Sequence, residues 1–103
     1  MKVYNKLIRD KIPLIMTKEG KEFSTHNASD EEYRKKLKEK LLEEVNEFLE
    51  DPCLEELADI AEVFGALVPA LGYTIEQLET EVRKKKRIKG AFRKRIILET
   101  VGE

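Results

Sequence analysis

Two groups of closely spaced acids are the residues of this sequence best suited to chemistry. Glu44 and Glu47 lie three positions apart, and Glu56 and Asp59 repeat that spacing further along the chain. Residues three apart are neighbours on one face of a helix. Four carboxylates that meet repel one another unless a cation neutralises them, and an all-oxygen ligand set suits Mg²⁺ or Mn²⁺. The spacing therefore predicts that Mg²⁺ or Mn²⁺ binds between the two pairs, with all four acids as candidate metal ligands.

A turn between two helices would bring these pairs together. Both pairs lie in segments with helical periodicity, and Asp51-Pro52 separates the segments. Proline does not continue a helix, so the chain is expected to break there and fold back as a hairpin. The four carboxylates would then meet near the closed end of that hairpin.

The alternative is that these are ordinary solvated acids, which are common at the margins of apolar stripes. On the first helix, with Leu37 taken as zero, the apolar stripe spans roughly 0° to 140° at about 100° per residue. Glu44 then falls at about −20°, against the edge of the stripe, while Glu43 falls near −120° and should face water. On the second helix, Ala66 and Ala70 share the side of the acids. Small residues indicate a closely packed face, where an unpaired carboxylate is unfavourable.

The surrounding pattern predicts a chain without extensive strands. Helices are expected over residues 11–19, 29–50, 53–71 and 75–89, with an extended arm at 1–10 and a tail at 92–101. Residues 21–27 alternate weakly, which fits an extended segment or a short strand. Ser29 with Glu32, and Thr74 with Gln77, have the spacing of capping boxes. The expected fold is all-α: a helical bundle built on an antiparallel helix hairpin, as a single domain over residues 1–103.

Composition limits the functions to consider. Charged residues make up 40% of the chain and hydrophobic residues 41%, with a net charge of −1. These values favour a helix-rich soluble domain and give no general case for binding a nucleic acid polymer. No apolar run is long enough to span a membrane. The single Cys53 excludes an internal disulfide and favours a cytoplasmic setting.

Three further features of the sequence bear on binding and assembly. Residues 83–95 are rich in Lys and Arg and contain no acid, so they form either a solvated helix face or a local anion site. His26, the only histidine, is expected to be an exposed loop residue. The segment 53–71 carries a broad apolar stripe, of which four large side chains are expected to need a second copy of the chain to bury them: Leu57, Phe64, Leu67 and Leu71.

Three motifs in order resemble a known family. Residues 4–13 (YNKLIRDKIP), the acidic helices with 40–45 (KLLEEV) and 55–59 (EELAD), and residues 83–92 (RKKKRIKGAF) resemble the MazG-like, phosphoribosyl-ATP pyrophosphohydrolase-like superfamily of all-α nucleoside triphosphate pyrophosphohydrolases. The likeness is to its small single-domain branch. One departure is Ala91, which stands where the branch has the second glycine of a Gly-Gly-Phe ending.

The resemblance implies an oligomeric, dimeric or tetrameric, Mg²⁺-dependent enzyme. Such enzymes cleave a nucleoside triphosphate between the α- and β-phosphates, giving a monophosphate and pyrophosphate, and many remove noncanonical or surplus nucleotides. Carried over by position, the four acids would hold the metal. Glu43, Glu44 and Glu47 would be the catalytic acids, with Glu43 orienting water or a metal ligand.

The departing pyrophosphate needs cationic partners. The candidates for phosphate contact are four residues of the arm and the basic stretch: Arg9, Lys11, Lys85 and Arg87. Arginine can contact phosphate through two parallel hydrogen bonds, whereas lysine acts as a point charge. These side chains could instead only solvate the arm and the last helix. The alternative function is a non-catalytic helical protein that binds nucleotides or a protein partner in a regulatory role.

Overall fold

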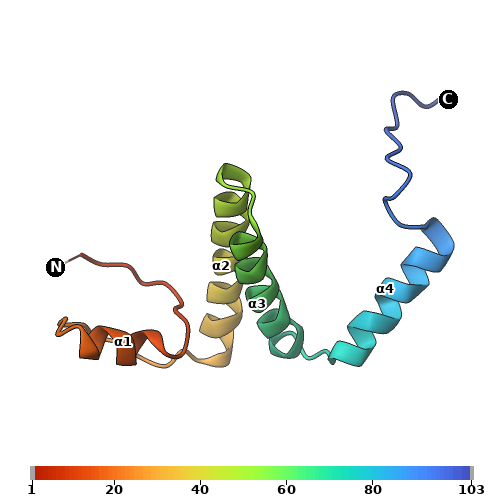
Figure 1. Cartoon of the computed structure of the whole chain (residues 1–103). Coiled ribbons are helices and arrows are strands. Elements are labelled where there is room, and N and C mark those ends of the chain that lie inside the picture. Colours follow the sequence, from red (N-terminus) through yellow and green to blue (C-terminus); the bar gives the residue numbers. More distant parts are fainter. Residues whose placement is uncertain (1, 103) are drawn as a thin grey trace. The chain divides into compact units, whose positions relative to one another are not determined.

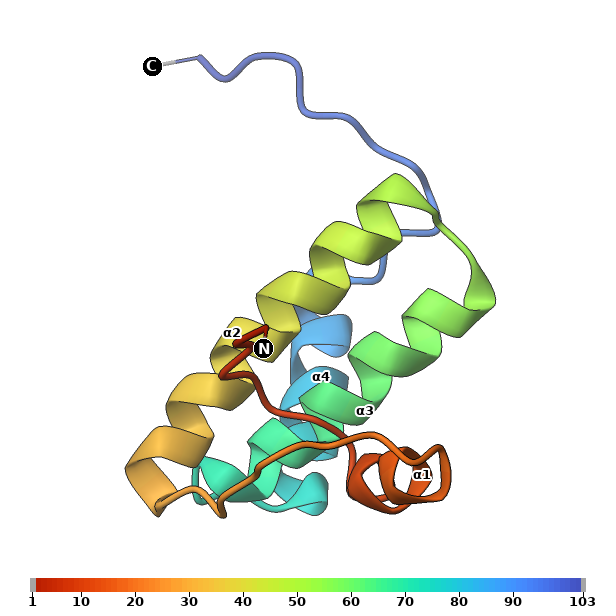
Figure 2. The same ribbon diagram turned by 90° about the vertical axis from the view of Figure 1, so that its left-hand side faces the viewer.

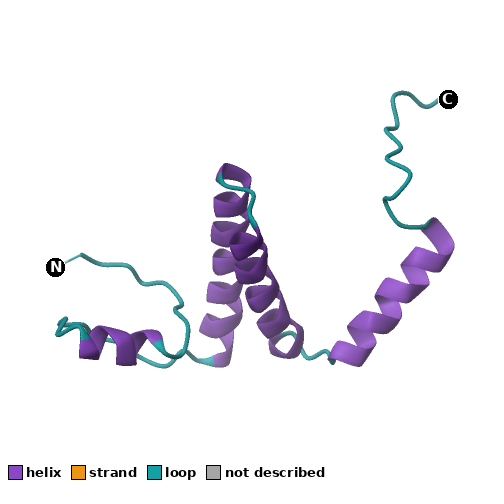
Figure 3. Cartoon of the chain, in the orientation of Figure 1, coloured by secondary structure: helices purple, strands orange, loops and turns teal. Residues whose placement is uncertain are grey.

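The structure is a computed structural model that describes residues 2–102. Within them every regular element is a helix: α1 (Ile12–Lys18), α2 (Asp30–Glu50), α3 (Leu54–Ala70) and α4 (Ile75–Lys89) (Figures 1 and 3). The all-α prediction is confirmed, and α2 and α3 form the predicted hairpin. Residues 21–27, for which an extended segment or a short strand was expected, form an irregular connection and no strand.

The internal contacts divide the chain into two compact units, Met1–Gly72 and Tyr73–Glu103. The first unit contains the arm, α1 and the hairpin, and the second contains α4 and the tail. The single domain over residues 1–103 stays a prediction, and the two units are described separately below.

Side-chain caps explain where α2 and α4 begin. Thr74 and Gln77 form both hydrogen bonds of the predicted capping box, at 2.9 and 3.1 Å. At α2, the Ser29 hydroxyl accepts a hydrogen bond from the Glu32 backbone N–H at 3.2 Å. The reciprocal half of that box is replaced, because the Glu32 carboxylate pairs with the exposed His26 Nε2 at 3.0 Å. His26 is thus an exposed loop residue, as expected, but it has a partner.

The core of the first unit lies between α2 and α3. Leu37 of α2 packs with Val63 and Leu67 of α3, and Ala66 and Ala70 lie against them. The face with the small residues is therefore the packed face, as the sequence indicated. Alanine allows two helices to approach closely, which also brings side chains near the closed end of the hairpin within reach of each other.

The N-terminal arm lies across this hairpin. Leu7 packs against the core, and the Lys36 ammonium donates a hydrogen bond to the Asn5 carbonyl at 2.7 Å. Lys6 pairs with Glu43 at 3.4 Å. Figure 2 looks onto the face of α2 and α3 that the arm crosses. The arm is irregular, so these side-chain contacts are what attach it to the helices.

Several large apolar side chains of the hairpin stay exposed. Leu42 and Leu49 fall at about 140° and 120° on α2, within the apolar stripe predicted from the sequence. They are nevertheless 63% and 69% exposed, because the core uses a narrower stripe. Leu57 and Phe64 of α3, and Leu71 directly after α3, remain nearly half exposed. Leu67 is only 8% exposed, so the expectation that it needs a second copy of the chain for burial is wrong. It faces Leu37 instead.

The second unit is a basic helix followed by an irregular tail. Gly90 ends α4 with φ of 86°, a left-handed conformation that glycine adopts readily. The tail keeps its apolar side chains exposed: Phe92, Ile96, Ile97, Leu98 and Val101.

Candidate metal centre

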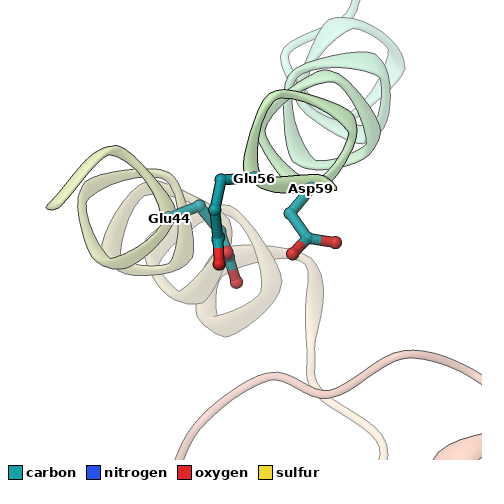
Figure 4. A group of neighbouring side chains, drawn as sticks. All are labelled: Glu44, Glu56 and Asp59. Carbon is teal, nitrogen blue, oxygen red and sulfur yellow. The ribbon is translucent and has the colours of Figure 1, made fainter. Parts of the chain in front are cut away.

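Three carboxylates from two helices meet at one place in the first unit. Glu44 of α2 and Glu56 and Asp59 of α3 each offer one oxygen, and these oxygens lie within 4.8 Å of one another (Figure 4). We call these residues the acidic trio. Opposite ligands of an octahedral Mg²⁺ ion, each about 2.1 Å away, are about 4.2 Å apart. The limit of 4.8 Å is close to this spacing, so the three oxygens lie near the range that such a ligand set spans.

The helix positions explain this convergence. Glu44 lies in the last two turns of α2, and Glu56 lies in the first turn of α3, directly after the short connection at residues 51–53. Asp59 follows Glu56 by three residues and so occupies the same face. In Figure 4 the carboxyl groups of Glu44 and Glu56 point in the same direction, side by side.

Two oxygens of the trio are buried without a partner. Glu44 Oε2 and Glu56 Oε2 have no hydrogen-bond donor among residues 2–102, and Glu44 is only 6% exposed. For the buried Glu44, an unsatisfied polar oxygen costs about 1–3 kcal/mol, and more when it is charged. The lone pairs of both oxygens are the donors that a hard divalent cation takes, so the residues present fit Mg²⁺ or Mn²⁺.

The electrostatics of the trio favour neutralisation. Burial raises the pKa of Glu44, and the neighbouring Glu47 adds to the effect, although a hydrogen bond from Lys40 opposes it. Burial also raises the pKa of Glu56, followed by the charges of Asp59 and Glu44. Both glutamates thus carry a charge that their surroundings disfavour, and a bound cation would reverse this.

Three basic side chains partly compensate the acids. Lys40 lies 3.3 Å from Glu44 and 3.4 Å from Glu43, and Arg9 Nη2 lies 2.8 Å from Asp59 Oδ1. Partial burial opposes ionisation of Glu43, but the charges and hydrogen bonds of Lys40 and Lys6 outweigh it and lower its pKa. Glu43 was expected to face water. That expectation is wrong in part, because Lys6 of the arm covers it and leaves its side chain 33% exposed.

The structure brings together three of the four predicted metal ligands. Glu47 is exposed and lies outside the trio, although it is close enough to Glu44 to raise that pKa. Its role as a ligand stays a prediction. Sequence reasoning missed Lys40 and Lys6. The spacing of Lys40 three and four residues before Glu43 and Glu44 could have identified the first, whereas no local signal points to the second.

The predicted phosphate-binding residues fall in both units. Arg9 lies at the trio, held by Asp59. Lys11 is exposed at the residue before α1. Lys85 and Arg87 are exposed on α4 of the second unit.

An open depression of about 400 Å³ lies elsewhere on the hairpin. It is lined by Asp30, Tyr33, Arg34, Ala66, Pro69 and Ala70. Arg34 is ten residues before Glu44 on α2, roughly 15 Å along the helix axis. The depression contains no member of the acidic trio, and the chemistry described here does not use it.

Comparison with protein-family models, curated proteins and solved structures finds no match to the chain. Within residues 2–102 no single helix is long and apolar enough to cross a membrane, and only α3 and α4 taken together, across the break between them, meet that criterion by length and composition.

Proposed function

We propose that the protein is a metal-dependent nucleotide pyrophosphohydrolase. It would hydrolyse a nucleoside triphosphate to the monophosphate and pyrophosphate. The observation that carries the proposal is the convergence of the acidic trio, with two buried carboxylate oxygens that lack any hydrogen-bond donor. The three sequence motifs that resemble the MazG-like superfamily also support it, and the acids of the trio belong to one of these motifs.

The acidic residues would have separate roles in binding the metal and positioning water. The acidic trio holds the cation, and Glu47 joins it from one turn further along α2. When bound, Mg²⁺ or Mn²⁺ would neutralise phosphate oxygens and activate water for attack. Glu43 stays ionised, because Lys40 and Lys6 lower its pKa, so it can accept a hydrogen bond from the attacking water. No Ser, Cys or His nucleophile is required.

The basic residues would bind the phosphates. Arg9 lies at the trio and can reach oxygens that the metal leaves uncovered. Lys11 follows it directly before α1. Phosphate contact by Lys85 and Arg87, which lie on α4 of the second unit, stays a prediction. A triphosphate carries more negative charge than a divalent ion neutralises, so additional cations assist the departure of pyrophosphate.

We also propose a cytoplasmic homo-oligomer, a dimer or tetramer, that acts on free nucleotides, including noncanonical ones. Leu57 and Phe64 lie on α3, Leu71 follows its last residue, and all three are nearly half exposed. Full burial of each large apolar side chain contributes about 1.5–3 kcal/mol, which favours association with a second copy. The single Cys53 is in keeping with a reducing compartment. Neither a nucleic acid polymer nor a membrane is proposed as a partner.

Pyrophosphate release from a panel of canonical and modified triphosphates tests the proposal. Release should require Mg²⁺ or Mn²⁺ and stop with a chelator. Glu56→Gln should reduce it at least about 100-fold, since even partners that only orient metal ligands contribute 10–100-fold. Glu62→Gln, an exposed carboxylate on the same helix, is the control and should retain activity. Nucleotide binding without release from any triphosphate would instead support the non-catalytic regulatory role.

A further inference from the structure

We propose that Arg9 and the divalent cation are alternative partners of Asp59, so that metal binding releases the arm arginine for the substrate. This inference rests on the proposed metal site and adds an order of events to it. Before metal binds, Arg9 neutralises one member of the acidic trio. After metal binds, the same guanidinium is free to contact phosphate.

The contact itself is direct and joins distant parts of the chain. Arg9 Nη2 donates a hydrogen bond to Asp59 Oδ1 at 2.8 Å, across fifty positions in sequence. A charge-assisted hydrogen bond of this length occupies a lone pair of the carboxylate and offsets part of its negative charge. Asp59 is therefore the member of the trio whose strength as a metal ligand depends on the arm, whereas Glu56 has an oxygen without a hydrogen-bond partner among residues 2–102.

A divalent cation and a guanidinium on one carboxylate repel each other. The oxygens of the trio lie within 4.8 Å of one another, so an ion held among them would lie close to the Arg9 guanidinium. Like charges at such separations interact strongly even when partly screened. The metal gains by displacing Arg9, and Arg9 in turn weakens metal binding while it stays.

The arm is attached weakly enough to allow this exchange. Its remaining ties to the hairpin are the Lys6–Glu43 pair at 3.4 Å, the Lys36 hydrogen bond to the Asn5 carbonyl and the packing of Leu7. The Arg9 side chain is 56% exposed, and ion pairs at this exposure are weak. Release of Arg9 therefore leaves α2 and α3 packed.

The exchange also resolves an apparent conflict in the site. Arg9, which is expected to bind phosphate, forms an ion pair with Asp59, which is expected to bind the metal. If the two contacts alternate, the arginine becomes available only when the metal is present, and a metal-free enzyme does not present it to nucleotides.

Measurement of Mn²⁺ affinity by the electron paramagnetic resonance signal of free Mn²⁺, without nucleotide, tests this directly. Arg9→Gln should bind Mn²⁺ roughly two- to fivefold more tightly than wild type, the range expected for loss of one exposed competing ion pair. Lys11→Gln removes the same charge from the same end of the arm but has no ion pair among the described residues, and its affinity should match wild type. Circular dichroism checks that both variants keep their helices.

Added Mg²⁺ should also move the side-chain N–H resonances of Arg9 in ¹⁵N-labelled protein toward those of exposed arginines. Weaker Mn²⁺ binding by Arg9→Gln would overturn the inference, because Arg9 would then orient Asp59 as a ligand instead of competing for it. Equal affinity would overturn it too, and in both cases the metal site would stand. Absence of Mn²⁺ binding to wild type and both variants is the one outcome that would reject the metal site as well.

Discussion

Replacement of Glu44 by glutamine should stabilise the protein without divalent cations and leave it less stable than wild type with them. Glu44 is the most buried member of the acidic trio, and its Oε2 has no donor. Glutamine keeps an oxygen that can accept from Lys40, now 3.3 Å from the carboxylate. Its amide can donate to a neighbouring carboxylate of the trio, so repulsion becomes a hydrogen bond.

The magnitude follows from the unsatisfied oxygen. A buried acceptor without a partner costs about 1–3 kcal/mol, and loss of the charged attraction to Lys40 offsets part of the gain. We expect a net increase of about 1 kcal/mol in the free energy of unfolding, or about 4–8 °C in Tm for a chain of this size. With Mg²⁺ at about 100 times its Kd, wild type gains about 2.7 kcal/mol, which exceeds that increase. The order of stability should then invert.

Thermal unfolding at one fixed protein concentration, in chelator and in saturating Mg²⁺, measures both the change in stability without metal and the gain in stability from Mg²⁺. Glu39→Gln is the matched control on α2, because its carboxylate is exposed and, among residues 2–102, pairs only with Lys36 at 3.2 Å. It should gain as much from Mg²⁺ as wild type does. If Glu44→Gln is less stable than wild type in chelator, or gains equally from Mg²⁺, the description of the acidic trio is refuted.

Three further predictions follow from the same geometry. Asp59→Ala and Glu47→Ala should each abolish turnover while circular dichroism shows unchanged helicity, and full turnover in both would reject these ligands. The two glutamates of the acidic trio have raised pKa values, so the folded state binds their protons more tightly than the unfolded state, where glutamate titrates near 4.5. The free energy of unfolding in chelator should therefore rise as pH falls from neutral toward about 4.5. Below that pH, Glu43 opposes the rise, because its pKa is lowered in the folded state. Urea titrations that show a steady fall in the free energy of unfolding from pH 7 to 5 would contradict this prediction. Sedimentation at micromolar concentration should show an oligomer that Leu57→Ser and Phe64→Ser dissociate, and a monomeric wild type would count against self-association.

The sequence predicts the hairpin well because its signals are local. Helical periodicity, the Asp51-Pro52 break and the cap at Thr74 each act within a few residues, and the structure agrees with all of them. The predicted position of Glu44 against the edge of the apolar stripe is also in keeping with its burial. These features need no knowledge of how distant segments meet.

The parts that sequence reasoning missed depend on distant contacts. Arg9 and Asp59 lie fifty positions apart, and Lys6 and Glu43 thirty-seven, so no periodic pattern links them. The partial cover of Glu43 follows from where the arm lies. The exposure of Leu42 depends on which stripe of α2 packs on α3, where Leu37 meets Val63 and Leu67.

The central claim is that the acidic trio supports hydrolysis of a triphosphate between its α- and β-phosphates. Phosphorus NMR of the products formed from a triphosphate that the protein accepts tests this most directly, with wild type and Glu56→Gln compared in Mg²⁺. The account predicts signals of nucleoside monophosphate and pyrophosphate with wild type, and unchanged triphosphate with the variant. Orthophosphate and diphosphate as products, or equal turnover by Glu56→Gln, would contradict it.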